Sequence, residues 1–278
     1  MSAATALLGD SPQRDYARKL RLFNAFAAPE LRAALADIGL KPGMRVLEAG
    51  CGCGETLGWL AATVGAEGLA VGCDLSAAHA LAARGQAAGA AVLQADLLRM
   101  PLRAASFDAV VSINTVNHLR DPLAGVRQLK TLLCGGGRLV LGQSSFLPDM
   151  YFAWDARLER LTNEAVRRYY RERYELDERQ LTAVRALLGL LQRAGLQQPS
   201  VRSLLIERIA PLKPADEAYL LEAIFRGSWG ERLRSYLSAA DFAALRRLCD
   251  PGDEAYALRR PDFHFLQSFT LAVGRVAP

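Results

Sequence analysis

The sequence predicts an α/β fold in which helices cover both faces of a mostly parallel sheet. Short apolar runs alternate with longer helical patterns along the first half of the chain. The first run, Val46-Leu47, leads into a loop with glycine at every second position. The second and third runs end in acids, Asp74 and Asp96. Repeated strand–loop–helix units of this kind place their loops at the carboxyl edge of the sheet, where ligands bind.

Composition bounds the class of protein. The chain has 278 residues, of which 51% are hydrophobic, and this is enough for a large core. The formal net charge is +5, but charges of both signs are interspersed without a Lys/Arg block, so we expect no nucleic-acid partner. Met1–Asp10 lacks the basic start and apolar core of a signal peptide. No run reaches the ~18 apolar residues of a membrane helix, so we expect a cytoplasmic protein without a membrane span.

Five cysteines stand at irregular spacing: Cys51, Cys53, Cys73, Cys134 and Cys249. An odd number in a chain without a leader favours reduced thiols. Cys51-x-Cys53 together with Cys73 does not have the spacing of a zinc knuckle. We therefore expect no metal site and interpret these cysteines as small buried residues beside a ligand pocket.

The glycine loop narrows the choice of ligand. It reads Glu48-x-Gly50-x-Gly52-x-Gly54. A dinucleotide site has the form G-x-G-x-x-G, and its last glycine would fall on Glu55. A P-loop is excluded because no Gly-Lys-Ser/Thr follows. An apolar helical pattern begins directly after the loop, so the loop lies at a helix start.

The pattern E-x-G-x-G-x-G resembles motif I of the class I S-adenosylmethionine (SAM)-dependent methyltransferases, which have a Rossmann-like fold. Phe107-Asp108-Ala109-Val110 resembles motif IV of the same family. The resemblance runs from about Val46 to Leu141 and more loosely to the end of the chain. It is closest to the small-molecule group that includes ubiquinone- and menaquinone-type and natural-product methyltransferases. It implies a doubly wound sheet of seven strands whose last strand is antiparallel, with helical cap insertions.

The resemblance also implies a set of cofactor-binding residues. Asp74 would hold the ribose hydroxyls, since a carboxylate accepts two hydrogen bonds from a diol, although it could instead only cap the next helix with Ser76. Asp96 would accept the adenine amino group, and the carbonyl near Asn114 would take the SAM ammonium. His79 is interpreted as a surface or cap residue. The full set is Glu48, Gly50, Cys51, Gly52, Gly54, Asp74, Leu75, Asp96, Leu97 and Asn114.

The remaining segments are assigned to the core or to caps. Residues 1–40 are expected to form an N-terminal helical extension over the cofactor, with Pro29 breaking its helix in two. Residues 41–145 form the cofactor-binding core. Residues 146–179 are rich in aromatic and charged side chains and form a helical cap insertion. Residues 180–278 complete the core, with strands at 201–209 and 265–276 and a second helical insertion at 214–262.

Two residues are candidates for catalysis. His118 follows the motif IV strand and could act as a general base, but a histidine here could equally serve only to order the loop. Tyr16 could contact the cofactor carboxylate or the substrate, and an aromatic residue on a core-facing helical stripe is at least as common. The stretch around Asn114 lacks the Asn/Asp-Pro-Pro-aromatic signature of enzymes that methylate amino groups of bases or glutamine.

The sequence thus predicts a methyltransferase that uses SAM, yields S-adenosylhomocysteine (SAH), and acts by in-line transfer to an O, N or C atom of a small, aromatic or hydrophobic metabolite such as a quinol, phenol or polyketide. Aromatic caps favour enclosure of a small molecule. The alternative is an enzyme of the same fold that uses SAM without methyl transfer, as a decarboxylase, hydroxylase or cyclase. A homodimer is possible.

Overall fold

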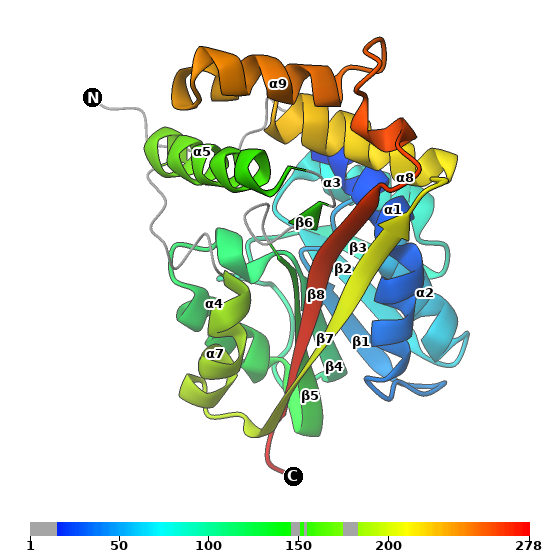
Figure 1. Ribbon diagram of the computed structural model, residues 1–278. Coiled ribbons are helices and arrows are strands. Elements are labelled where there is room, and N and C mark those ends of the chain that lie inside the picture. The colour runs from blue at the N-terminus through cyan, green and yellow to red at the C-terminus, as the bar shows by residue number, and fades with distance from the viewer. Residues whose placement is uncertain (1–15, 146–150, 153–154, 175–182) are drawn as a thin grey trace.

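A computed structural model describes residues 16–145, 151–152, 155–174 and 183–278 (Figure 1). One mixed sheet organises the chain. Its strands are β1 (Arg45–Ala49), β2 (Leu69–Asp74), β3 (Ala90–Gln94), β4 (Phe107–Ile113), β5 (Leu133–Ser144), β6 (Tyr151–Phe152), β7 (Gln197–Ile209) and β8 (His264–Arg275). The predicted strands at 46–47, 201–209 and 265–276 are therefore present, with ends that differ by at most four residues.

The strand order confirms the predicted Rossmann-like topology. The order is β3-β2-β1-β4-β5-β8, and β7 pairs with the other edge of β8. Strands β1 to β5 are parallel to one another, whereas β8 is antiparallel to both β5 and β7. The short strand β6 pairs with the start of β8, at Phe265 and Leu266. The sequence-based expectation of seven core strands with an antiparallel last strand is correct, and β6 is a two-residue addition to it.

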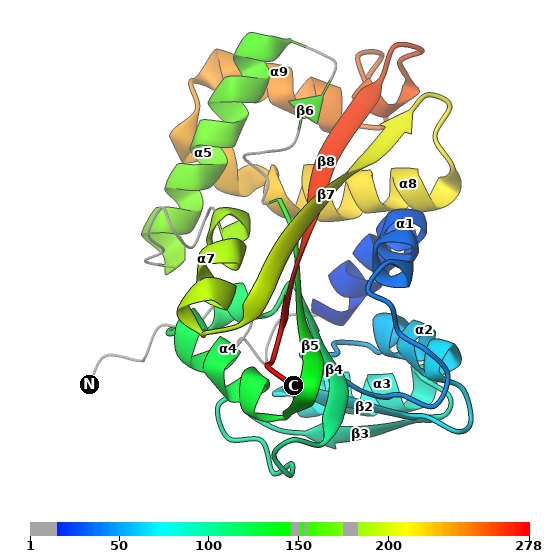
Figure 2. The ribbon, with the colours of Figure 1, turned by 90° about the horizontal axis from the view of Figure 1, so that it is seen from below.

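Helices cover the two faces of the sheet (Figure 2). On one face lie α1 (Tyr16–Ala36), α2 (Glu55–Val64) and α3 (Ala77–Gln86). On the other lie α4 (Pro122–Thr131) and α7 (Leu187–Arg193). Each face has its own apolar cluster: Leu31, Leu57 and Leu60 belong to the first, and Val126 and Leu190 to the second. The short strands of the parallel half are apolar toward both faces because both are buried.

Helix α1 corrects one expectation. It continues from Tyr16 to Ala36 with Pro29 inside it, instead of breaking there. Proline lacks the backbone donor that would pair with the Ala25 carbonyl four residues earlier. The guanidinium of Arg208 on β7 donates to the neighbouring Phe26 carbonyl and lies 4.6 Å from the Phe26 ring centroid. This contact ties the turn before Pro29 to the sheet.

The two predicted insertions lie at the end of the sheet where β5 ends and β8 begins (Figure 1). The first contains α5 (Ala156–Tyr174), and the second contains α8 (Pro214–Tyr219), the π-helix η4 (Leu220–Ser228), η5 (Glu231–Tyr236), α9 (Ala239–Cys249) and η6 (Ala257–Arg259). The sequence did not predict the π-helix. Between the two insertions lie the 3-10 turn η3 (Ala183–Ala186) and α7. Residues 175–182 and most of 146–154 lie outside the described parts of the chain.

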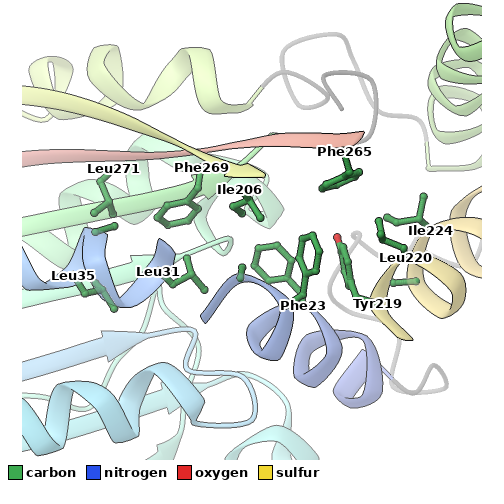
Figure 3. Close-up of a cluster of buried hydrophobic side chains, with 14 of the residues drawn as sticks. Phe23, Leu31, Leu35, Ile206, Tyr219, Leu220, Ile224, Phe265, Phe269 and Leu271 are labelled. Carbon is green, nitrogen blue, oxygen red and sulfur yellow. The ribbon is translucent and has the colours of Figure 1, made fainter. Parts of the chain in front are cut away.

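An apolar cluster joins this cap region to the sheet. Figure 3 shows Phe23 from α1 and Tyr219 from α8 beside Phe265 and Phe269 of β8. The Phe26 and Tyr219 rings are stacked, with centroids 4.3 Å apart. Trp229 is buried at 2% exposure. The cap is therefore continuous with the main core on the α1 face of the sheet.

Candidate functional site

The glycine loop connects β1 to α2, and two of its glycines are required by geometry. Gly50 has φ +81°, and a Cβ there would lie 2.3 Å from the Thr115 side chain. Gly54 has φ +93°, and its Cβ would lie 2.7 Å from the Cα of Ala83 on α3. Both positions combine a left-handed backbone with a close neighbour, so only glycine fits.

The loop amides are already paired within the protein. The Gly50 and Cys51 amides donate to the Cys73 carbonyl at 2.8 and 2.9 Å, and the Gly54 amide donates to the Cys51 carbonyl at 2.9 Å. The Gly52 amide donates to the Asp74 carboxylate at 2.9 Å. A dinucleotide or phosphate site instead presents free amides to the anion. The four loop amides named above are therefore unsuited to cradle a phosphate.

Glu48 lies at the end of β1, directly behind the loop. Its side chain is 2% exposed, and its Oε2 atom is buried without a hydrogen-bond partner. Burial raises the pKa of Glu48 well above its usual value, and the nearby carboxylates of Glu55 and Asp74 raise it further. Such an acid is costly until a donor reaches it, and the group that satisfies it best is a cation. Glu48 is thus placed to accept from a cationic donor on a ligand.

Asp74 ends β2 and is tied to three groups. Its Oδ2 accepts from the Gly52 amide at 2.9 Å, and its Oδ1 accepts from the Ser76 amide at 2.9 Å. The Nδ1 atom of His79 lies 3.4 Å from Oδ1. Burial raises the pKa of Asp74, but the hydrogen bonds from His79, Ser76 and Gly52 outweigh it and leave this pKa below its usual value. Asp74 is thus a carboxylate near neutral pH.

The position of His79 corrects the sequence interpretation. Its side chain is 17% exposed and faces Asp74, so it is not a surface residue. Ser76 is the N-cap of α3, and its hydroxyl accepts from the His79 amide at 3.4 Å. This cap places residue 79 in the first turn, beside the strand end. Spacing alone could have suggested the contact, because a helix that starts after a β-strand acid returns its first turn toward that acid.

The expected adenine contacts lie at the next strand ends. Leu75 is 49% exposed, and Asp96, after β3, is also exposed. The Asp96 Oδ1 accepts from the Leu98 amide at 2.9 Å, as in an Asx turn. The Leu97 side chain is 5% exposed within the α4-face core, so only its backbone can serve a ligand. Leu75 and Asp96 therefore flank an accessible surface beside the loop.

Asn114 links the ends of β4 and β5. It has φ +51°, and its Oδ1 accepts from both the amide and the hydroxyl of Ser144, at 2.8 and 3.0 Å. Asparagine tolerates this left-handed conformation better than most residues. Its backbone carbonyl, which the sequence offered to the SAM ammonium, accepts a hydrogen bond from the His118 ring. Through these two bonds Ser144 orients the Asn114 side chain.

His118 ends the short helix η1 (Val116–His118). Its Nδ1 atom is buried without a hydrogen-bond partner. Burial lowers the pKa of His118 to about 4, and the nearby Asn114 carbonyl only partly opposes this. The ring is therefore neutral at pH 7.

Helix α1 lies against the loop. Leu20 comes within 3.3 Å of the position of a Cβ on Gly52, and the Asn24 amide donates to Glu55 at 2.9 Å. The Cys53 thiol lies 3.8 Å from the Ala17 carbonyl. Tyr16 opens the helix, but its side chain lies outside the described part of the structure. The structure thus brings α1 to the loop, while a contact by Tyr16 stays a prediction.

The cysteines near the loop are packed as small apolar residues. Cys51, Cys53 and Cys73 are buried and free. Burial raises the pKa of Cys51, and it raises the pKa of Cys73 to about 12. Among the described residues no group of three or more His, Cys, Asp or Glu side chains has the geometry to hold a metal ion.

Comparison with known proteins agrees with this geometry. Residues 47–141 match the family described as "Methyltransferase domain". This segment is a methyltransferase domain of the class I SAM-dependent kind. The matched segment contains the glycine loop, Asp74, Asp96 and Asn114, so it covers the cofactor half of the sheet. SAM carries the methyl group in this family, and the loop pairing and the buried Glu48 described above fit a cationic ligand without phosphate.

The curated relatives are similar over parts of their length. A protein of 37.1 kDa in a Streptomyces fradiae transposon is 29% identical over 63% of this chain and 50% of its own length. The probable tRNA methyltransferase 9B of Mus musculus is 32% identical over 41% of this chain and 24% of its own. The demethylmenaquinone methyltransferase of Beutenbergia cavernae is 30% identical over 42% of this chain and 48% of its own length. The chain thus spans half or less of each of these relatives.

Solved structures show the same fold. A SAM-dependent methyltransferase from Aquifex aeolicus has a TM-score of 0.51 and 19% identity, over 69% of this chain and 93% of its own. A candidate methyltransferase from Bacillus halodurans has a TM-score of 0.55 and 17% identity, over 89% of this chain and 99% of its own. In the described residues of this chain, no helix is both long and apolar enough to cross a membrane.

Proposed function

We propose that this methyltransferase transfers a methyl group from SAM to a small, aromatic or hydrophobic metabolite. One observation supports SAM as the cofactor. The buried Glu48 has no partner for its Oε2 atom, and it lies behind a loop whose amides are already paired. A positively charged, phosphate-free ligand satisfies both features. SAM combines an ammonium, a sulfonium and a ribose diol, and the acids Glu48 and Asp74 are suited to the first and last of these.

The proposed roles follow the geometry of the strand ends. Glu48 would accept from the ammonium and Asp74 from the ribose hydroxyls. Asp96, Leu75 and the Leu97 amide would receive the adenine, and α1 would close over the loop. When bound, SAM supplies an activated methyl group, so the protein mainly has to align the acceptor atom.

His118 would assist the acceptor as a hydrogen-bond acceptor. Its ring is neutral at pH 7, and its Nδ1 atom has no hydrogen-bond partner within the protein. A pKa of about 4 makes it a weak base, since a general base works best with a pKa near the working pH. We therefore favour an orienting role for His118 on an acceptor hydroxyl or amine, with proton loss helped by the acidity of the acceptor itself.

The cap region supports a small acceptor. Phe23, Tyr219 and Phe265 gather under it from three different elements (Figure 3). Next to them the Gln267 amide donates to the Ser145 carbonyl at 3.0 Å, while its own Oε1 is buried without a partner. Sites for small molecules are usually lined by aromatic side chains with a few polar groups, so an aromatic cap region favours a small acceptor. The tRNA methyltransferase relative matches over 24% of its own length, so it says little about the acceptor.

Methyl-labelled SAM provides the test. The purified protein would be incubated with a panel of quinols, phenols, polyketide-like phenols and unmodified tRNA, and label would be followed into each acceptor by mass spectrometry. Label in a small aromatic compound with formation of SAH supports the proposal. Label in tRNA alone would overturn the small-molecule assignment. A changed substrate with SAM still methylated would favour the alternative, a SAM-using enzyme without methyl transfer.

A further inference from the structure

The His79–Asp74 pair has a consequence for cofactor binding. A carboxylate offers about four hydrogen-bond positions, two on each oxygen. On Asp74, Oδ1 already receives the Ser76 amide and faces His79 Nδ1, and Oδ2 receives the Gly52 amide. One position is left, on Oδ2. A ribose diol donates two hydrogen bonds, so one of the three present partners has to leave.

The distances indicate which partner leaves. The two backbone amides lie at 2.9 Å and belong to the loop and to the start of α3, so they are fixed by the fold. His79 lies at 3.4 Å and is held only by its own side-chain torsions. A weak contact made by a rotatable side chain is the easiest to replace.

We propose that His79 occupies the position on Asp74 that one ribose hydroxyl takes, so that His79 competes with the cofactor and competes more strongly when it is protonated. The inference rests on the proposed role of Asp74 in holding the ribose. Imidazole is the side chain whose charge ordinarily changes between pH 5 and 8. Protonated His79 is attracted to the Asp74 carboxylate, and cofactor affinity therefore falls as the pH falls.

Other titratable and charged groups lie near this pair, and their effects on cofactor binding have to be distinguished from that of His79. Glu48 on β1 and Glu55 on α2 interact with each other, and Glu48 also interacts with Asp74. Cys51, Cys53 and Cys73 line the loop with raised pKa values, and Arg21 of α1 approaches Cys53. Among these groups Glu48 also weakens cofactor binding when it is protonated, because it is proposed to hold the ammonium. A ligand without that ammonium removes the contribution of Glu48.

The test uses 5′-methylthioadenosine, which keeps the adenosine and the ribose diol but has no amino-acid part. Its dissociation constant would be measured by calorimetry from pH 5.5 to 8.5, with SAH as a second ligand. The wild-type protein should bind methylthioadenosine about threefold more weakly at pH 5.5 than at pH 8.5. His79→Leu should remove most of this pH dependence and bind more tightly than wild type at pH 5.5. His264→Leu is the matched control, because His264 pairs with Glu207 at 2.8 Å away from the loop, and it should behave as wild type.

The outcomes separate the inference from the proposed function. If His79→Leu keeps the wild-type pH dependence, or binds more weakly at every pH while its thermal unfolding is unchanged, His79 supports the site and the inference is wrong. If the wild-type protein binds both ligands without any pH dependence, the inference also fails but the cofactor site stands. If it binds neither ligand at any pH, the proposed function fails first.

Discussion

Arg208 on β7 donates to Glu30 on α1 at 2.7 Å, and the same guanidinium donates to Asp216 on α8 at 2.8 Å. All three side chains are at most 18% exposed. Arg208 also reaches the Phe26 carbonyl in the turn before Pro29. One side chain thus joins the N-terminal helix, the edge of the sheet and the second cap insertion.

Replacing Arg208 tests this junction. Arg208→Met leaves two largely buried carboxylates without their cation and should lower the free energy of unfolding by about 3 kcal/mol. Arg247→Met is the control, because Arg247 pairs with Asp253 at 3.1 Å but is 64% exposed, and it should have a much smaller effect. Urea denaturation measures both. Equal effects of the two substitutions would show that the junction adds no special stability.

The glycine loop gives a second test, of backbone geometry. Gly54→Ala has to place a side chain at φ +93° and 2.7 Å from the backbone of Ala83, so it should destabilise the fold by about 3 kcal/mol. Gly65 also has a positive φ, +70°, but nothing lies within 4 Å of its Cβ position. Gly65→Ala should therefore cost only about 1 kcal/mol. A Gly54→Ala protein as stable as Gly65→Ala would contradict the close packing of the loop on α3.

Glu48 is expected to trade stability for cofactor binding. Burial raises the pKa of Glu48 in the folded state, so the folded protein favours the protonated acid. The contribution of Glu48 to stability is therefore fully present below its unfolded-state pKa and is lost as the pH rises through its folded-state pKa. Glu48→Gln removes this loss and should raise the stability of the ligand-free protein at pH 7.5 by on the order of 1 kcal/mol. The same variant should bind SAH at least about tenfold more weakly.

Melting curves from pH 4 to 8 with and without SAH check both parts of the Glu48 prediction. Glu48→Gln should gain most over wild type at the alkaline end of this range. A variant that is less stable than wild type at pH 7.5 and binds SAH normally would assign Glu48 a structural role.

His118 predicts a different pH dependence. Its pKa is about 4 in the folded protein, against about 6.5 for a free histidine, so the unfolded chain takes up a proton first as the pH falls. Stability from this group is present above pH 6.5 and is lost toward pH 4, by up to about 3 kcal/mol. The imidazole resonance of His118 should stay that of a neutral ring from pH 8 to 5. His118→Gln identifies the resonance, and a midpoint near 6.5 would contradict the buried, neutral ring.

The sequence predicted most of the parallel half because there local pattern and fold agree. Each acid after an apolar run lies at the carboxyl edge, so the local pattern was enough to place Glu48, Asp74 and Asp96. The contacts it missed depend on tertiary packing. Pro29 predicted a helix break, but Arg208, which contacts the turn before Pro29, is 179 positions later in the chain. The pairing of Asn114 with Ser144 joins two strand ends whose register no local pattern reveals.

The cap region was the least predictable part. Its helices have aromatic and charged residues on several faces, so periodicity located them only roughly, and the π-helix at 220–228 has no local sequence signal. His79 was misplaced because a polar residue in a first helical turn is commonly exposed. Its side chain instead turns toward the acid that ends the preceding strand.

Calorimetric titration of SAH into the wild-type protein and into Asp74→Ala at pH 7.5 is the most direct test of the cofactor site. One equivalent of SAH should bind to the wild-type chain, and Asp74→Ala should weaken binding at least about tenfold, since hydrogen bonds to a charged group are lost. Asp121→Ala removes another aspartate, the N-cap that accepts from the Ala124 amide at 2.9 Å, and should leave the affinity unchanged. No binding to the wild-type protein, or equal affinities for wild type and Asp74→Ala, would contradict the site proposed around Glu48 and Asp74.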